Sequence, residues 1–293
     1  MELFIHERDE VSYVALGGRF DVTGVEEVEQ PFTEATTGRG LPTIVEMSGI
    51  TFMSSLGIGF LYANTKELKK AGCKLVLLNP KGMVDTVLRS SKMDRVMPIA
   101  YELEEALQLL GFERASFATD VPKVDAPPQP ETVEAAPNAA AELKLSIKNE
   151  TSELTDLYAQ VENFLEAHST SQRSRYVVNL ALEELVVNVI RYAYVDFDEH
   201  RIDIDLGIVN EQFILVIEDD GTPFDPLEAL SPSLNPELDQ EGDEDLDFEV
   251  GGLGLQLVMD LVDVMNYARV EEKNRVEVRV QFRNEGAAPF ASG

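Results

Sequence analysis

The sequence contains no tryptophan, a single cysteine and only three histidines among its 293 residues. One cysteine cannot form an internal disulfide or supply a cysteine-based metal site. No apolar run approaches the ~20 residues that a bilayer-spanning helix needs. The charged start, MELFIHERDE, lacks the apolar stretch of a secretory signal. These absences favour a cytoplasmic protein that does not enter a membrane.

Basic residues are also scarce. The chain holds 24 lysines and arginines against 54 aspartates and glutamates, a formal net charge of −30. Residues 1–115 carry 12 basic and 17 acidic side chains, a net of −5, so the remaining residues carry 12 and 37, a net of −25. A surface this acidic repels nucleic acid and anionic membranes, and we expect neither as a direct partner. The charge suits solubility, and it also suits a basic protein partner.

Composition divides the chain into two domains. Residues 116–141 hold five prolines and no hydrophobic periodicity, which is typical of a semi-extended linker. This linker separates a domain at residues 1–115 from a second domain at residues 142–284, and a short polar tail follows at 285–293. Two domains of ordinary size agree with the length of the chain.

The first domain alternates predicted strands with predicted helices. Strands are predicted at 11–18, 41–47, 73–79 and 97–99, and helices at 54–71, 83–93 and 101–110. Gly72 is expected to end the first of these helices. Strands that alternate with helices in this way favour an α/β layer fold.

The second domain opens with a predicted strand and two predicted helices. Strands are predicted at 143–149, 201–209, 212–219, 266–272 and 275–282, and helices at 151–168, 173–194 and 253–265. Tight turns are expected at Asn210-Glu211 and at Lys273-Asn274. The pattern predicts an α+β fold in which helices cover one face of a mixed or antiparallel sheet.

Glu184 and Asn188 lie four residues apart in the longest predicted helix, so both lie on one face, one turn apart. An asparagine carbonyl is an oxygen ligand suited to Mg²⁺, which usually keeps waters and phosphate oxygens as its other ligands. A carboxylate one turn earlier can act as general base on a hydroxyl. The alternative is an ordinary solvated helix face, and this is the interpretation that we adopt for Glu183.

Two glycine-containing motifs follow. Asp219 ends a predicted strand shortly before Gly221. Its carboxylate can accept a hydrogen bond from an exocyclic amine such as that of adenine, and glycine permits close backbone approach, although Asp-Gly pairs also form plain turns. Gly251, Gly252 and Gly254 open a predicted amphipathic helix. The first amides of such a helix bind phosphate well; the alternatives are a lid hinge or a plain helix start.

Together, ELVVNVIRYAY, DDGTPFDP and GGLGLQLVMDLVD resemble the N, G1 and G2 boxes of the GHKL (Bergerat) ATPase fold, over nearly all of residues 142–284. The second domain is most similar to the bacterial anti-sigma-factor serine kinases. The resemblance implies ATP and Mg²⁺ as ligands, with Glu184 as catalytic base, Asn188 as Mg²⁺ ligand and Asp219 as the reader of adenine. It also implies that the pocket and its lid are shaped by four glycines, Gly221, Gly251, Gly252 and Gly254.

One segment departs from this pattern. Residues 236–249, between the second and third motifs, hold eight acidic residues and no basic residue. Two interpretations stay open: a flap that points outward, or a lid that weakens ATP binding. We do not expect a histidine kinase, because none of His6, His168 and His200 lies in a predicted helical hairpin that could carry a phosphoacceptor.

Residues 45–59, VEMSGITFMSSLGIG, resemble the signature of STAS domains, the fold of anti-sigma-factor antagonists, and the likeness extends over most of residues 1–110. In phosphorylated antagonists this segment reads Phe-Met-Asp-Ser-Ser-Gly, and the serine before the glycine receives the phosphate. Leu56 occupies that position in this chain and has no hydroxyl. Ser55 remains as a candidate acceptor, although Ser54 and Ser55 also suit helix N-capping.

The two resemblances together imply a cytoplasmic partner-switching regulator whose second domain is an ATP-dependent serine/threonine kinase of the anti-sigma-factor type. The implied partners are antagonist STAS proteins, a sigma factor, a PP2C-type phosphatase and a second copy of the kinase-like domain. The alternative is a non-catalytic, nucleotide-dependent binding module, which Leu56 and the acidic segment favour. A third interpretation is intramolecular: a 26-residue linker has a coil span of about 25–30 Å, enough for Ser55 to reach the kinase site of its own chain.

Overall fold

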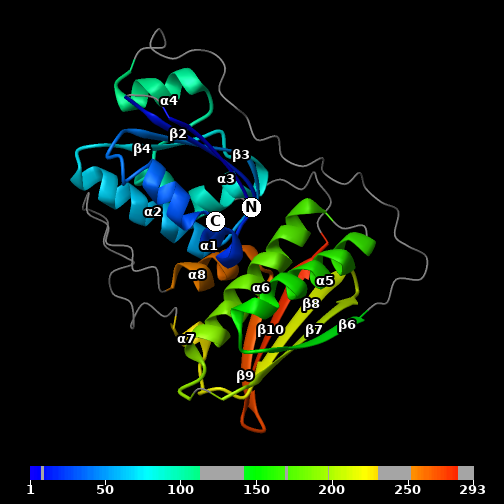
Figure 1. The fold of residues 1–293 in the computed structure, drawn as a ribbon. Coiled ribbons are helices and arrows are strands. Elements are labelled where there is room, and N and C mark those ends of the chain that lie inside the picture. The colour runs from blue at the N-terminus through cyan, green and yellow to red at the C-terminus, as the bar shows by residue number, and fades with distance from the viewer. Residues whose placement is uncertain (8–9, 113–141, 169–170, 197, 230–251, 283–293) are drawn as a thin grey trace. The chain divides into compact units, whose positions relative to one another are not determined.

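The computed structural model describes residues 1–7, 10–112, 142–168, 171–196, 198–229 and 252–282. They form two compact units, an N-terminal one and a C-terminal one, which Figure 1 shows and which we describe separately. The predicted linker, the predicted tail and the acidic segment at 236–249 lie outside the described residues. No helix within the described ranges has both the length and the apolar character needed to cross a membrane.

The N-terminal unit contains one mixed five-stranded sheet in the order β1-β2-β3-β4-β5. Its strands are β1 (Glu2–Glu7), β2 (Ser12–Phe20), β3 (Thr43–Met53), β4 (Leu75–Leu78) and β5 (Ile99–Ala100). Its helices are α1 (Val22–Ala35), α2 (Ser55–Lys70), α3 (Gly82–Ser90) and α4 (Leu103–Leu110), with a short 3₁₀ turn at Met93–Arg95. β1 pairs antiparallel to β2, whereas β2 to β5 pair in parallel. The predicted α/β class is confirmed.

Burial on both faces explains the apolar strands of this sheet. Tyr13, Val76 and Leu107 belong to a buried cluster that α4 makes with one face. On the other side α1 packs against β2 and against α2, as Figure 1 shows. Strands covered on both faces read as nearly continuous hydrophobic runs, which is why the sequence predicts them well.

β1 and α1 were not predicted from the sequence, and each has a physical reason. β1 is an edge strand with acidic residues at both ends and an exposed Phe4, so its alternation is weak. α1 contains β-branched residues, a glycine and Pro31, all poor helix formers. The helix forms nevertheless because Asp21 caps it, accepting a bond from the amide of Gly24, and because Phe32 on its inner face is fully buried.

The C-terminal unit contains an antiparallel five-stranded sheet in the order β6-β7-β8-β10-β9. Its strands are β6 (Glu142–Lys148), β7 (Arg201–Val209), β8 (Gln212–Asp219), β9 (Val264–Val270) and β10 (Lys273–Gln281). Its helices are α5 (Leu154–Ala167), α6 (Gln172–Tyr192), α7 (Pro226–Ala229) and α8 (Leu253–Leu261), with a 3₁₀ turn at Thr151–Glu153. α5 and α6 lie over one face of the sheet (Figure 1), which confirms the predicted α+β class.

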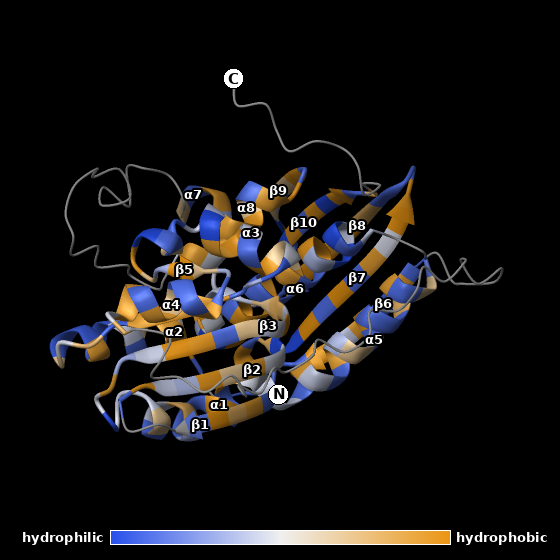
Figure 2. Cartoon of the chain, turned by 90° about the horizontal axis from the view of Figure 1, so that it is seen from above, coloured by the Kyte–Doolittle hydropathy of each residue, from blue (hydrophilic) through white to orange (hydrophobic). Residues whose placement is uncertain are grey.

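Alternation along the strands sets the two faces of this sheet. Figure 2 shows hydrophobic and hydrophilic bands in turn along β7. Ile202, Ile204 and Leu206 are buried, whereas the residues between them carry ion pairs on the opposite face, such as Lys273 with Asp203 at 3.2 Å. The charged face therefore needs no covering layer, and the apolar face holds α5 and α6.

Two predicted boundaries in this unit are wrong. The β9–β10 turn lies at Glu271-Glu272, which take left-handed φ angles of 49° and 65°, and not at Lys273-Asn274. α8 ends at Leu261 and not near residue 265. Asparagine is a common turn former, but the pairing of β10 with β8 places Asn274 opposite Asp219 inside the strand. The turn predicted at Asn210-Glu211 is confirmed, with φ angles of 49° and 61°.

Candidate nucleotide-binding site

α6 carries the first two predicted site residues. Ser171 is the N-cap of the helix, and its hydroxyl accepts a bond from the amide of Ser174 at 3.1 Å. Glu184 is 6% exposed and Asn188, one turn later, is half-buried. Glu183 is also buried, so the expected solvated position is wrong for that residue. The helix is buried on all sides at this level, because it lies between the sheet, α5 and α8.

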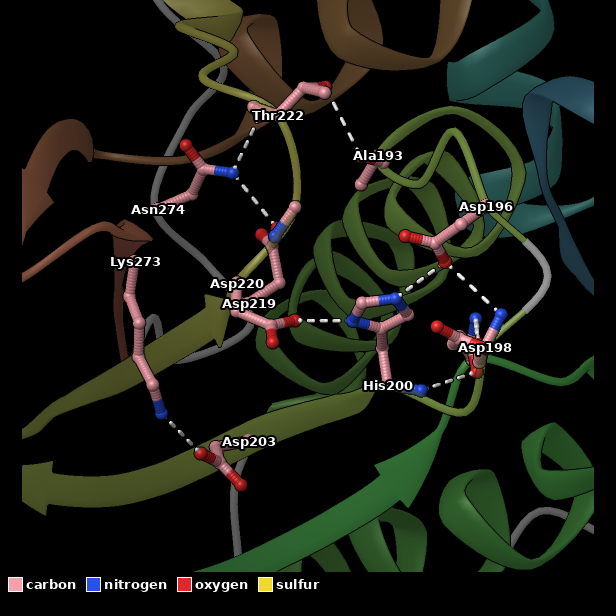
Figure 3. Close-up of polar contacts among 12 residues, drawn as sticks. Ala193, Asp196, Asp198, His200, Asp203, Asp219, Asp220, Thr222, Lys273 and Asn274 are labelled. Carbon is pink, nitrogen blue, oxygen red and sulfur yellow. Dashed lines mark hydrogen bonds and ion pairs between the residues drawn. The ribbon is translucent and has the colours of Figure 1, made fainter.

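The end of α6 is tied to the loop that follows β8. The carbonyl oxygen of Ala193 accepts a bond from the amide of Thr222 at 2.8 Å and a second from its hydroxyl at 3.2 Å. Figure 3 shows this contact beside the aspartates of the loop. Two motifs that lie about 30 residues apart in the sequence are thereby held against each other.

Asp219 is the last residue of β8 and is 4% exposed. Its Oδ1 accepts hydrogen bonds from the amide of Gly221 and from Nδ2 of Asn274, both at 2.9 Å. Within the described part of the chain no hydrogen bond reaches its Oδ2. Burial raises the pKa of Asp219, whereas the bonds from Asn274 and Gly221 oppose the rise. The residue therefore presents one unused acceptor oxygen in a largely desolvated setting.

Gly221 is required by close packing. A Cβ at this position would lie 2.6 Å from the Cβ of Ala193 and 2.7 Å from its carbonyl oxygen. Any other residue would push the loop away from α6, so packing against Ala193 accounts for this glycine.

Asn274 is a residue that sequence reasoning missed, because it was assigned to a turn. It is 3% exposed. Its Nδ2 also donates to the carbonyl oxygen of Thr222 at 2.9 Å, and its Oδ1 accepts from Tyr267 at 2.9 Å and from Arg269 at 2.8 Å. Its position follows from the pairing of β10 with β8, which places residue 274 opposite Asp219 and which local sequence patterns do not contain.

α8 begins where the glycine-rich motif is predicted. Gly252 has φ 136° and ψ −28°, a backbone conformation that side chains rarely adopt, and no side chain of the described residues caps the helix. Gly254 is buried in the first turn, and α8 packs against α6. Gly251 lies outside the described residues. The first amides of α8 therefore have no side-chain partner among the described residues, and such a helix N-terminus favours an anionic group.

His200 links the segment that follows α6 to the loop that follows β8, and sequence reasoning missed this residue too. Its Nε2 lies 2.8 Å from Asp196, and its Nδ1 lies 3.0 Å from Asp220, as Figure 3 shows. The imidazole stacks on Tyr194 with ring centroids 4.1 Å apart. The bond with Asp196, and further that with Asp220, raises the pKa of His200 above its ordinary value of 6.5. Protonated, the ring holds Asp196 and Asp220 together.

We expect this clamp to make stability depend on pH. Because the pKa of His200 is higher in the folded state than in the unfolded state, its stabilisation is fully present below about pH 6.5 and is lost as the pH rises through the folded-state value. Urea unfolding of the wild type and of His200→Asn should therefore give a larger difference in unfolding free energy at about pH 6 than at about pH 8.5. An equal difference at both values would contradict the clamp.

In the N-terminal unit, the predicted acceptor segment starts α2. Ser54 is the N-cap, and its hydroxyl accepts a bond from the amide of Gly57 at 3.5 Å. Ser55 is the first helical residue and is only 8% exposed. Leu56 is half-buried. The capping role expected of these serines falls to Ser54, and Ser55 would have to become exposed before any kinase could reach it.

Comparison with known families decides what these two units are. Residues 3–106 match the STAS domain family, and residues 147–280 match the histidine kinase-like ATPase domain family. The chain is a STAS domain fused to a histidine kinase-like ATPase domain. Both predicted resemblances are confirmed. The ATPase match extends from β6 to β10, so it includes α6, the Asp219 loop and α8.

The ATPase domain is similar to the serine/threonine-protein kinase BtrW of Bordetella bronchiseptica, with 28% identity over 134 residues that cover 46% of this chain and 88% of BtrW. The STAS domain is similar to the unphosphorylated anti-sigma factor antagonist SpoIIAA of Bacillus (24% identity, TM-score 0.34), over 38% of this chain and 98% of SpoIIAA. The RsbU and RsbW domains of a Mycobacterium tuberculosis protein match 68% of this chain and 44% of that protein, with 13% identity and a TM-score of 0.33.

Membership of this ATPase family implies ATP binding. The described residues fit that ligand. Asp219 has an acceptor oxygen available for an exocyclic amine, and the start of α8, which no described side chain caps, suits a phosphate.

The three histidines lie outside the helices. His6 lies in β1, His168 follows α5 and His200 precedes β7, so no helix among the described residues carries a histidine that could act as a phosphoacceptor.

Proposed function

We propose that the ATPase domain is an ATP- and Mg²⁺-dependent protein serine/threonine kinase, and that the chain is a partner-switching regulator of the anti-sigma-factor type. The observation that carries the proposal is the contact of Ala193 with Thr222, which joins the helix of Glu184 and Asn188 to the loop of Asp219. The relative BtrW is named a serine/threonine-protein kinase, which supports the same activity.

Each predicted residue has one role in this proposal. The Oδ2 of Asp219 accepts a hydrogen bond from the adenine amine, and the start of α8 near Gly252 and Gly254 binds phosphate oxygens. Asn188 supplies one oxygen to Mg²⁺. No group of three or more histidine, cysteine or acidic side chains suited to a metal occurs in the described ranges, so Mg²⁺ would take its other ligands from phosphate and water. Gly251 is assigned to the same phosphate-binding loop from the resemblance alone.

Glu184 is the proposed catalytic base. It orients the serine hydroxyl of a protein substrate and accepts its proton as the serine oxygen bonds to the γ-phosphorus, while the bond from that phosphorus to the bridging β,γ oxygen breaks and ADP leaves. Bound Mg²⁺ neutralises the charge on the phosphate oxygens. Phosphoryl transfer of this kind depends mainly on positioning and electrostatics.

The serine substrate is proposed to lie on a separate STAS antagonist. Leu56 has no hydroxyl at the acceptor position of this chain, and Ser55 is only 8% exposed. The STAS domain would then serve as a docking module. A sigma factor and a PP2C-type phosphatase are the further partners, a homodimer through the ATPase domain is the proposed assembly, and the cytoplasm is the proposed location.

A non-catalytic, nucleotide-dependent adaptor is the second candidate, and Leu56 is the observation that favours it. The full chain, radiolabelled ATP, Mg²⁺ and an antagonist with an intact acceptor serine separate the two candidates. The kinase proposal expects label on the antagonist. Nucleotide binding by calorimetry without any transfer would support the adaptor, and no nucleotide binding at all would exclude both.

A further inference from the structure

Asn274 is the most highly bonded side chain beside Asp219. Its Nδ2 donates to Oδ1 of Asp219 and to the carbonyl oxygen of Thr222, each at 2.9 Å, as Figure 3 shows. Its Oδ1 accepts from the hydroxyl of Tyr267 and from Nη1 of Arg269. The amide thus uses both of its donors and both lone pairs inside the protein.

Arg269 fixes which way the amide points. A guanidinium can only donate, so the atom of Asn274 that lies 2.8 Å from Arg269 must be the carbonyl oxygen. The opposite atom, which faces Asp219, must then be the NH₂ group. Nη1 of Arg269 also donates to the carbonyl oxygen of Gly221 at 2.8 Å, so the same group holds the glycine of the loop. The orientation is therefore determined by chemistry and not by an arbitrary choice between N and O.

This orientation has a consequence for Asp219. Its Oδ1 is occupied by two donors, from Asn274 and Gly221. A carboxylate that accepts two hydrogen bonds at one oxygen is held in one rotation. Burial raises the pKa of Asp219, and these two bonds oppose the rise. Oδ2 then faces the remaining direction as an acceptor only. An acceptor pairs with the 6-amino group of a purine and repels a 6-oxo group.

We propose that Asn274, oriented by Arg269 and Tyr267, is a positioning residue for nucleotide recognition, which holds Asp219 so that the site selects a 6-amino purine. Asn274 itself touches no nucleotide in this proposal and acts through Asp219. The inference rests on the proposed ATP-dependent function and deepens it, because it assigns the base preference to residues of the β9–β10 hairpin.

Replacing the amide by a carboxyl gives a specific test, Asn274→Asp. At low pH the new carboxyl keeps a proton and can donate to Oδ1 of Asp219 as the amide does. At higher pH both groups ionise at hydrogen-bond distance and repel, so Asp219 loses its position. Asn266→Asp is the matched control. Asn266 is exposed on the neighbouring strand β9, and its replacement by aspartate adds the same charge.

Other ionisable groups face this pair and must be matched between proteins. Asp220 and Arg269 shift the pKa of Asp219 in opposite directions. Burial, and further the charge of Asp219, raises the pKa of Tyr194, which follows α6. His200, which precedes β7, contacts Asp220. All of these groups are present in the wild type and in both variants. The dissociation constant of each variant is therefore divided by that of the wild type at the same pH, which removes the titration that the two proteins share.

The dissociation constant of Mg·ATP is measured by calorimetry on the full chain from about pH 5.5 to about pH 8.5. For Asn274→Asp the ratio to wild type should lie within about threefold at the acid end and rise to about tenfold or more at the alkaline end. For Asn266→Asp the ratio should stay near one throughout. A flat ratio for Asn274→Asp overturns the inference, and a wild type that does not bind ATP overturns the proposed function instead.

Arg269 provides a second pair of variants in case Asn274→Asp does not fold. Arg269→Met removes the donor that orients the amide, whereas Arg269→Lys keeps a donor in reach of Oδ1. The inference expects ATP affinity to fall by about threefold to tenfold in Arg269→Met and to be largely restored in Arg269→Lys. Wild-type affinity in Arg269→Met would overturn it.

Discussion

Glu184→Gln is expected to abolish detectable phosphoryl transfer while Mg·ATP still binds. The substitution keeps the shape of the side chain on α6 and removes only the basic oxygen that would accept the serine proton. Loss of a positioned general base typically lowers the rate by about 10²–10⁴-fold. The rate of transfer to a serine-bearing STAS antagonist, measured with radiolabelled ATP, should decrease by a factor in this range. The dissociation constant of Mg·ATP, measured by calorimetry, should change by about threefold at most.

Glu183→Gln is the matched control for this variant. Glu183 is the preceding residue of α6 and is also a buried carboxylate, so the two substitutions change charge and packing in the same region. We expect Glu183→Gln to retain most of the transfer rate. Equal losses in both variants would mean that a carboxylate at this level of α6 supports the fold and not the chemistry. Full activity in Glu184→Gln would remove Glu184 from the proposed mechanism.

Asp219→Asn is expected to lower ATP affinity by about 10²-fold or more. The amide oxygen can still accept from Gly221 and Asn274, so the loop keeps its bonds. The other position, now an NH₂ group, meets the adenine amine as a donor against a donor, and two unpaired buried groups are costly. Burial already disfavours the charge of Asp219, as its raised pKa indicates, so a neutral residue should not unfold the domain.

Two comparisons make the Asp219→Asn result specific to base recognition. Inosine triphosphate carries an acceptor in place of the amine, so its affinity relative to ATP should increase in the variant. Asp220→Asn removes the neighbouring carboxylate, whose side chain is 50% exposed and bonds to His200. We expect this control to change ATP affinity by about threefold at most. An unchanged preference for ATP over inosine triphosphate in Asp219→Asn would contradict the role of Asp219.

Local pattern was sufficient for much of this site. The four-residue spacing of Glu184 and Asn188 predicts a shared helix face, and α6 forms with its N-cap at Ser171. Asp219 was placed at a strand end, where it lies. Each of these predictions needs only residues that are near one another in sequence.

The residues that were missed depend on contacts between distant segments. Asn274 bonds to Asp219 across 55 residues because β10 pairs with β8 in one register, and a turn placed two residues late hides that pairing. His200 bonds to Asp220 across 20 residues. Glu183 is buried because α6 is covered on every side, which a two-sided helix pattern does not predict. Register and layer order are tertiary properties, so single-segment patterns do not contain them.

The STAS domain was recognised from one short segment. Residues 45–59 carry its signature, and the family match over residues 3–106 confirms the domain. Leu56 replaces the acceptor serine of that signature, which suggests a docking role for this domain and not a substrate role. The structure adds that Ser54 caps α2 and that Ser55 is largely covered. A serine that is 8% exposed must reach solvent before it can receive a phosphate, which is consistent with the proposed acceptor on another chain.

The central claim is tested most directly by mapping phosphorylation sites. The full chain is incubated with Mg·ATP and a STAS antagonist that has an intact acceptor serine, and both proteins are digested and examined by mass spectrometry. We predict a phosphate on the antagonist serine and none on residues 54–55 of this chain. A phosphate on Ser55, or an unmodified antagonist despite ATP binding measured in the same sample, would contradict it.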